Sequence, residues 1–203
     1  MITIDDVMTA APVIPVLVLD GSHDPRALAE TFVEAGLPVL EVTLRTPQAL
    51  DAIRAMADVS GAIVGAGTVL NADQLKQAED AGAQFIVAPG LTEPLTRAAL
   101  DSGLAYLPGV ATAGDIMRGL DLRLSRFKFF PAESSGGLPA LKALSGPFGD
   151  VRFCPTGGIR PDTAREWLAH PSVRCVGGSW LVPAGADLDT VGKLAQEAAA
   201  LRP

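Results

Sequence analysis

The sequence has little of the material that several classes of protein require. It contains 16 Lys and Arg against 23 Asp and Glu, which gives a formal net charge of −7 and a pI near 4.8. Without an overall basic field, binding to nucleic acid or to an anionic membrane surface is not expected. No stretch approaches the roughly 18 apolar residues of a membrane span, and the start, MITIDDVM, lacks a signal-peptide pattern. We therefore expect a cytoplasmic protein that contacts neither nucleic acid nor membrane.

Cysteine and histidine are also scarce, with two of each in 203 residues. Cys154 and Cys175 lie in apolar, strand-like runs without metal-ligand spacing or a disulfide framework, so they are predicted to be buried, reduced thiols. His23 and His170 have no clustered partners, which argues against a metal centre or a Ser-His-Asp triad. We predict no bound metal.

What the chain does have is material for one core and many short elements. It is 48% hydrophobic with a mean hydropathy of +0.31, and it contains 21 Gly and 16 Pro. No linker or shift in composition marks a boundary between domains. Residues 1–203 are therefore predicted to form a single domain.

Apolar runs recur along the chain, with starts 20 to 26 residues apart. The runs are Val13–Leu19, Val39–Leu44, Ala62–Gly65, Phe85–Ala88, Ala105–Pro108, Arg126–Phe130, Val151–Thr156 and Val173–Gly177. Between them lie helix-start signals at Asp24-Pro25, Thr46-Pro47, Asn71 and Thr112, and helix-ending glycines at 36, 82 and 103. Eight strands alternating with helices predict an α/β fold, specifically a compact (β/α)8 barrel. The alternative, an open doubly wound sheet, usually carries a G-x-G-x-x-G motif that is missing after the first run.

One of only four lysines falls in an unusual position. Lys128 lies in an aromatic run, and strand alternation places Phe127 and Phe129 toward the helices and Lys128 toward the barrel interior. An interior lysine can be one half of a structural ion pair. Alternatively, an amine in an apolar site loses its proton more easily and attacks carbonyl carbon.

The second run offers partners for this lysine. Glu41, Thr43 and Arg45 share the polar face of that strand, which would point into a barrel. A carboxylate, a guanidinium and an amine can then converge at one end. These residues alone leave catalysis and an internal salt-bridge network equally open.

Glycine pairs follow the last two runs, in Gly157-Gly158 and in Gly177-Gly178 before Ser179. Barrels commonly hold a phosphate at these two strand ends, where exposed backbone N–H groups favour an anion. Two such pairs predict a phosphorylated ligand bound without a basic surface.

These motifs together resemble the KDPG/KHG class I aldolase family. The resemblance rests on Glu41–Thr46 (EVTLRT), Gly65–Leu70 (GAGTVL), Lys128–Glu133 (KFFPAE), Arg152–Ile159 (RFCPTGGI) and Gly177–Pro183 (GGSWLVP). It extends in unbroken order from about Val13 to Pro183. The (β/α)8 fold expected above is also the fold that this resemblance implies.

The resemblance implies a role for each of eleven residues. Lys128 would form the Schiff base and Glu41 would be the general acid and base, while Arg45, Thr68, Pro89, Phe130 and Thr156 would bind substrate and Gly157, Gly158, Gly178 and Ser179 would hold its phosphate. It also implies a homotrimer and no cofactor other than the covalent Schiff base through Lys128.

The implied reaction is cleavage of 2-keto-3-deoxy-6-phosphogluconate to pyruvate and D-glyceraldehyde 3-phosphate, a step of the Entner–Doudoroff pathway. The alternatives are an aldolase for 4-hydroxy-2-oxoglutarate or for the galactonate epimer. Less favoured are a phosphosugar epimerase, which would need no nucleophilic lysine, and a non-catalytic phosphosugar-binding protein, which would have no use for Glu41, Arg45 and Lys128 together.

Overall fold

Strands and helices alternate along almost the whole chain, as the spacing of the apolar runs predicts. The structure, a computed structural model, describes residues 2–201. The strands are β1 (Val13–Leu17), β2 (Val39–Thr43), β3 (Ile63–Gly67), β4 (Phe85–Val87), β5 (Ala105–Leu107), β6 (Gly109–Val110), β7 (Arg126–Phe129), β8 (Arg152–Pro155) and β9 (Val176–Gly178). The helices are α1 (Ile4–Thr9), α2 (Pro25–Glu34), α3 (Ala49–Ala57), α4 (Ala72–Asp80), α5 (Glu93–Ser102), α6 (Ala113–Asp121), α7 (Gly137–Ser145), α8 (Pro161–Leu168) and α9 (Leu188–Ala199).

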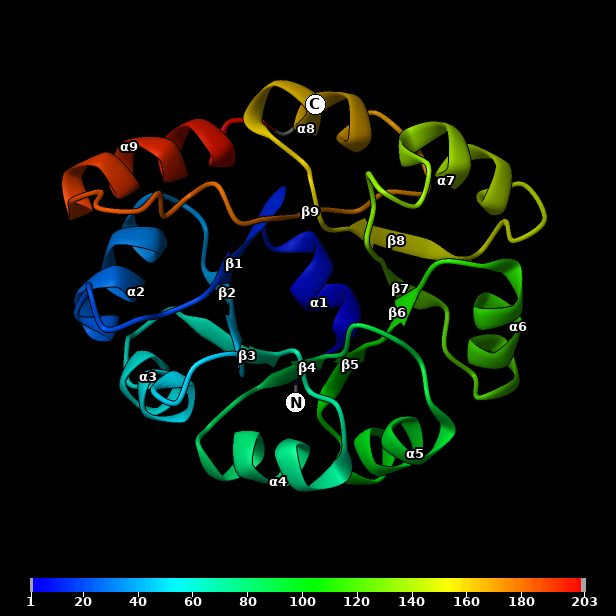
Figure 1. Ribbon diagram of the computed structural model, residues 1–203, viewed down its shortest axis with the longest axis horizontal. Helices are drawn as coiled ribbons and strands as arrows, with labels where there is room; N and C mark the ends of the chain where they lie inside the picture. Colours follow the sequence, from blue (N-terminus) through cyan, green and yellow to red (C-terminus); the bar gives the residue numbers. More distant parts are fainter. Residues whose placement is uncertain (1, 202–203) are drawn as a thin grey trace.

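All the strand pairings within residues 2–201 are parallel, and the strands curl around a common centre with α2 to α9 outside them (Figure 1). Six strands form one sheet in the order β5-β4-β3-β2-β1-β9, and three form a second sheet in the order β6-β7-β8. This curled parallel sheet inside a layer of helices confirms the predicted α/β class.

The regular ladders do not form the single eight-stranded ring that the sequence predicts. The predicted run Ala105–Pro108 forms only β5, which ends at Leu107, because Pro108 has no N–H to donate to a ladder. β6 begins just beyond the run, at Gly109, and belongs to the second sheet. The Pro108 carbonyl still accepts a bond from Lys128 N at 2.9 Å. Between the two sheets at their other edges, Phe153 and Val173, and Thr156 and Gly177, form isolated bridges. The predicted strand from Val173 is regular only from Val176 onward.

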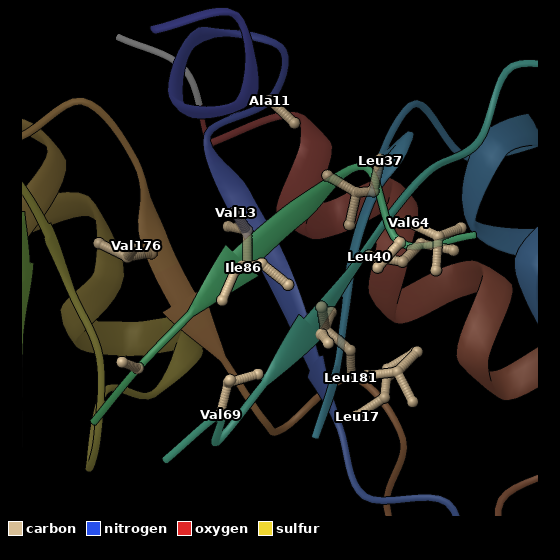
Figure 2. Close-up of a cluster of buried hydrophobic side chains, with 14 of the residues drawn as sticks. Ala11, Val13, Leu17, Leu37, Leu40, Val64, Val69, Ile86, Val176 and Leu181 are labelled. Carbon is tan, nitrogen blue, oxygen red and sulfur yellow. The ribbon is translucent and has the colours of Figure 1, made fainter. Parts of the chain in front are cut away.

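Two apolar clusters lie on the two sides of the strands. The larger fills the space between the strands and the surrounding helices, and Figure 2 shows part of it around Val13, Leu40 and Val64. Phe127 and Phe129 belong to this outer cluster, as strand alternation predicts. The smaller cluster lies inside the curl of the sheet and contains Cys154 and Cys175, which are buried and free as predicted.

A short first helix that the apolar pattern did not reveal crosses the middle of the ring of strands (Figure 1). Thr3 and Asp6 cap its start reciprocally. Val7 and Met8 are fully buried in the inner cluster, and Asp5 Oδ1 accepts a bond from Arg126 Nε at 2.6 Å. Because Arg126 is the first residue of β7, α1 covers the end at which the strands begin.

The helix-start signals were correct with one exception. The side chains of Asp24, Asn71 and Thr112 each accept a bond from the first turn of α2, α4 and α6. The signal at Thr46-Pro47 is wrong, because Ala49 N donates to Thr46 O in a turn and α3 begins only after Gln48. Among residues 2–201, no helix combines the length and the apolar character that crossing a membrane requires.

Candidate active site

A lysine and a glutamate meet inside the curl of the sheet. Lys128 on β7 and Glu41 on β2 place Nζ 3.0 Å from Oε1, and their side chains are 7% and 4% exposed. β2 and β7 are not neighbours in either sheet, so the two side chains reach toward each other across the interior. A buried ion pair is costly in desolvation and adds little stability over apolar residues. Stability alone therefore does not account for this pair.

Two neighbours define the surroundings of the pair. Lys128 Nζ lies 5.1 Å from the centre of the Phe130 ring, within the range of a cation–π interaction. Thr43, two residues after Glu41 on the same face of β2, is buried and donates its hydroxyl to Leu17 O at 2.8 Å. Thr43 thereby ties β2 to β1 directly beside the glutamate.

This arrangement can activate an amine. A lysine must lose a proton before it attacks a carbonyl carbon, and Glu41 Oε1 is within hydrogen-bond distance to accept that proton. Once protonated, the same carboxyl group can donate to an oxygen that leaves the carbon. Within residues 2–201, no three or more His, Cys, Asp or Glu side chains are grouped to hold a metal ion.

Arg45, Thr68 and Pro89 lie just after the carboxyl ends of β2, β3 and β4, which are consecutive in the six-stranded sheet. Thr68 has a φ of 60°, a backbone conformation that a β-branched residue rarely adopts. The backbone at Gly109 lies close to the backbone at Pro89, since a Cβ added at Gly109 would lie 2.1 Å from Pro89 O. The structure thus brings these three predicted residues to one edge of the sheet.

The predicted phosphate loops also lie side by side. Thr156 directly follows β8 and pairs with Gly177 in β9, and a Cβ at Gly177 would lie 2.3 Å from Thr156 Oγ1. Gly157 and Gly158 adopt φ values of 103° and 81°, which favour glycine. Gly178 ends β9 and Ser179 comes next.

Phe130 connects the lysine with the phosphate loops. A Cβ at Gly157 would touch the Phe130 ring at 3.4 Å, and Lys128 Nζ lies over the same ring, 5.1 Å from its centre. The aromatic ring therefore adjoins both the amine and the glycine loop.

Several contacts within the site escaped the sequence interpretation. Lys128 pairs in register with Cys154, and a hydrogen bond with the Cys154 thiol, together with burial, raises the pKa of the Cys175 thiol well above its usual range. Both thiols belong to the inner cluster, next to the lysine. Gly109 and Gly177 provide space for other site residues, and their contacts depend on distances between strands that no sequence motif reports.

An amine held against a carboxylate inside a curled parallel sheet, beside glycine loops suited to an anion, is typical of enzymes that act on carbonyl compounds through a covalent imine. The model of the KDPG and KHG aldolase family matches residues 4–194. The chain belongs to this family, and the resemblance inferred from its motifs is confirmed.

Known relatives match this chain in sequence and structure over nearly the full length. The 2-dehydro-3-deoxy-phosphogluconate aldolase of Zymomonas mobilis is 58% identical over 200 residues, which cover 98% of this chain and 96% of the relative. A crystal structure of the 2-keto-3-deoxy-6-phosphogluconate aldolase of Z. mobilis with 3-phosphoglycerate superposes with a TM-score of 0.96 at 58% identity, covering 98% and 96% of the two chains. The KDPG aldolase of Legionella pneumophila, with pyruvate captured as a covalent carbinolamine, superposes with a TM-score of 0.94 at 41% identity over 98% of both chains.

Proposed function

We propose that this protein is a class I aldolase that cleaves 2-keto-3-deoxy-6-phosphogluconate to pyruvate and D-glyceraldehyde 3-phosphate, as in the Entner–Doudoroff pathway. The observation that carries the proposal is the buried contact of 3.0 Å between Lys128 Nζ and Glu41 Oε1. The names of relatives such as the Z. mobilis aldolase support the choice of substrate.

The reaction begins with Glu41 taking a proton from Lys128. The neutral amine adds to the C2 ketone, and the carbinolamine loses water, with Glu41 donating the proton, to give an iminium. Glu41 then removes the proton of the C4 hydroxyl, the C3–C4 bond breaks, and its electrons pass to the iminium nitrogen as an enamine forms. The aldehyde leaves, Glu41 protonates the enamine at C3, and addition of water releases pyruvate and Lys128.

The remaining predicted residues orient the substrate in this scheme. Arg45 binds the carboxylate of the pyruvyl part, and Thr68 and Pro89 line its position at the same edge of the sheet. Phe130 packs against the carbon chain, and Thr156 contacts the hydroxyl groups. The backbone at Gly157, Gly158, Gly178 and Ser179 holds the 6-phosphate.

The imine nitrogen accepts the electrons of the broken bond, so the chemistry requires neither a metal nor a dissociable cofactor. The phosphorylated 2-keto acid is then the partner of the site. This scheme also differs from that of a phosphosugar epimerase or a silent binding protein, neither of which needs Lys128.

Cleavage of 4-hydroxy-2-oxoglutarate is the second candidate, because the family includes KHG as well as KDPG aldolases. The adjoining glycine loops favour the phosphorylated substrate over it. The galactonate epimer differs from the gluconate compound only at C4, where Thr156 is the proposed contact. Pyruvate release from each of the three compounds, measured with a coupled dehydrogenase, distinguishes these activities.

A chemical test of the covalent step is borohydride reduction in the presence of pyruvate. We expect a mass increase that peptide mapping assigns to Lys128. Turnover without any trapped adduct would contradict the Schiff-base mechanism.

We also propose that residues 1–203 form one domain in which the two sheets act as one (β/α)8 barrel. The continuous chain from β5 through Pro108 to β6 supports this. So do the two bridges from Phe153 to Val173, just before β9, and from Thr156, just after β8, to Gly177. The free thiols of Cys154 and Cys175 support a cytoplasmic location. The proposed homotrimer, which rests on the family resemblance, is tested by light scattering on the purified protein.

A further inference from the structure

Glu133 lies directly behind the glycine loop to which the phosphate is assigned. Its backbone N–H donates to Gly157 O at 3.0 Å, and a Cβ added at Gly158 would lie 2.7 Å from Glu133 Cβ. The preceding residue, Ala132, donates its N–H to Thr156 O at 2.8 Å. Three successive residues of the loop after β8 therefore rest against the segment that contains Glu133.

The side chain of Glu133 fixes this segment to α8. Its Oε1 accepts a bond of 3.0 Å from the indole Nε1 of Trp167 on α8. Trp167 is only 2% exposed, and its ring packs against Phe129 with 6.3 Å between ring centres. Trp167 is thus held in place by the outer cluster. A buried indole N–H that loses its acceptor is left unpaired, which lowers the stability of the fold.

The other carboxylate oxygen faces the start of α7. A Cβ added at Gly137, the first residue of α7, would lie 3.4 Å from Glu133 Oε2. A negative charge is favourable at the N-terminus of a helix. Glu133 consequently links α7, α8 and the loop of Gly157 and Gly158 through a single side chain.

We propose that Glu133 is a positioning residue for phosphate recognition, which holds the Gly157–Gly158 backbone at the distance that a phosphate group requires. This inference rests on the proposed function only in assigning a phosphate to that loop. Glu133 does not act on the pyruvyl end, because its side chain faces the loop after β8, the start of α7, Trp167 on α8 and the charge of Arg160 just before α8. Its loss should weaken the binding of phosphorylated ligands selectively.

The test compares four variants in the full-length protein. Glu133→Ala removes both the acceptor and the methylene groups behind Gly158, and Trp167→Phe removes only the donor. Glu133→Gln keeps an oxygen that can accept the Trp167 N–H and is the conservative rescue. Glu166→Ala, next to Trp167 and exposed on α8, is the matched control. The readouts are calorimetric titration with 3-phosphoglycerate and the rate of borohydride-trapped adduct formation with pyruvate.

We expect Glu133→Ala and Trp167→Phe to raise the Kd of 3-phosphoglycerate about three- to tenfold, the effect of losing a hydrogen bond that positions the site. Glu133→Gln and Glu166→Ala should stay near the wild-type Kd, and the trapping rate with pyruvate should be the same in all four. An unchanged Kd in both Glu133→Ala and Trp167→Phe would overturn the inference, as would an equal loss of pyruvate trapping.

The result is separable from the proposed function. If wild-type protein cleaves the phosphorylated substrate but Glu133→Ala and Trp167→Phe bind 3-phosphoglycerate with the wild-type Kd, only the role of Glu133 is wrong. If the wild-type protein releases no pyruvate but the variants weaken 3-phosphoglycerate binding as described, the proposed reaction is wrong and the positioning role stands.

Discussion

Gly67 leaves the space that the carboxylate of Glu41 occupies. The two residues lie on adjacent strands, β3 and β2, and a Cβ added at Gly67 would be 2.3 Å from Glu41 Oε1. This oxygen is the one that contacts Lys128 Nζ at 3.0 Å. The contact between acid and amine therefore depends on a missing side chain on a third strand.

Gly67→Ala should displace the Glu41 carboxylate and lower kcat. A shift of about 1 Å in a catalytic group can cost on the order of 100-fold in rate, and we expect a loss between about 10-fold and 100-fold. Steady-state pyruvate release measures the loss. Gly149→Ala is the matched control, because a Cβ at Gly149 meets nothing within 4 Å.

A double-mutant cycle identifies the partner in the clash. Overpacking of this kind costs about 1–3 kcal/mol of unfolding free energy. Urea denaturation should show that cost for Gly67→Ala in the wild-type background and a much smaller one in the Glu41→Ala background. Equal costs in both backgrounds would mean that another contact resists the methyl group.

Lys128→Ala should abolish both turnover and borohydride trapping. Alanine also leaves Glu41 buried without a partner, at a cost of about 3–5 kcal/mol in stability. Lys128→Arg separates the two effects, because a guanidinium keeps the positive charge beside Glu41 but forms no imine. Mass spectrometry after reduction with pyruvate should find no adduct in either variant, and adduct formation in Lys128→Arg would assign the imine to another residue.

Alternation along single strands was sufficient to place the central pair. Phe127 and Phe129 had to face the helices, so Lys128 faced inward, and the same logic applied to Glu41 on β2. Strand ends were less certain, because they depend on pairing between strands. Pro108 ends one predicted strand a residue early and a further short strand begins after it, while the predicted strand from Val173 makes one isolated bridge and is regular only from Val176.

Contacts between distant segments could not be predicted. The space at Gly67 exists because Glu41 points toward β3, and the tie between Glu133 and Trp167 spans 34 residues. No local sequence pattern signals either of these contacts. Helix α1 has only six residues, and the burial of Val7 and Met8 depends on strands far along the chain.

Ser179→Glu should raise the KM for the phosphorylated substrate. Ser179 directly follows β9 beside the glycine loops, so a carboxylate there would repel the phosphate group. At an effective dielectric constant of about 20, two charges about 4 Å apart repel by roughly 4 kcal/mol, which screening by solvent and salt reduces. We expect at least a tenfold rise in KM in the pyruvate-release assay, with proton exchange into pyruvate unchanged. Ser179→Ala is the neutral control, and an equal slowing of pyruvate exchange would place Ser179 at the other end of the substrate.

Met8→Ala should destabilise the fold without changing the chemistry. Met8 is fully buried in the inner cluster, and removing a side chain of this size from a core costs about 2–5 kcal/mol. Asp5→Asn is the control on the same helix, since the Asp5 side chain is 52% exposed and its ion pair with Arg126 should contribute less than about 1 kcal/mol. Urea denaturation measures both changes. Because α1 covers the end at which the strands begin and Lys128 and Glu41 lie further along β7 and β2, kcat of Met8→Ala should stay close to wild type below its melting temperature. A large fall in kcat in the folded variant would show instead that α1 supports the position of the catalytic pair through the inner cluster.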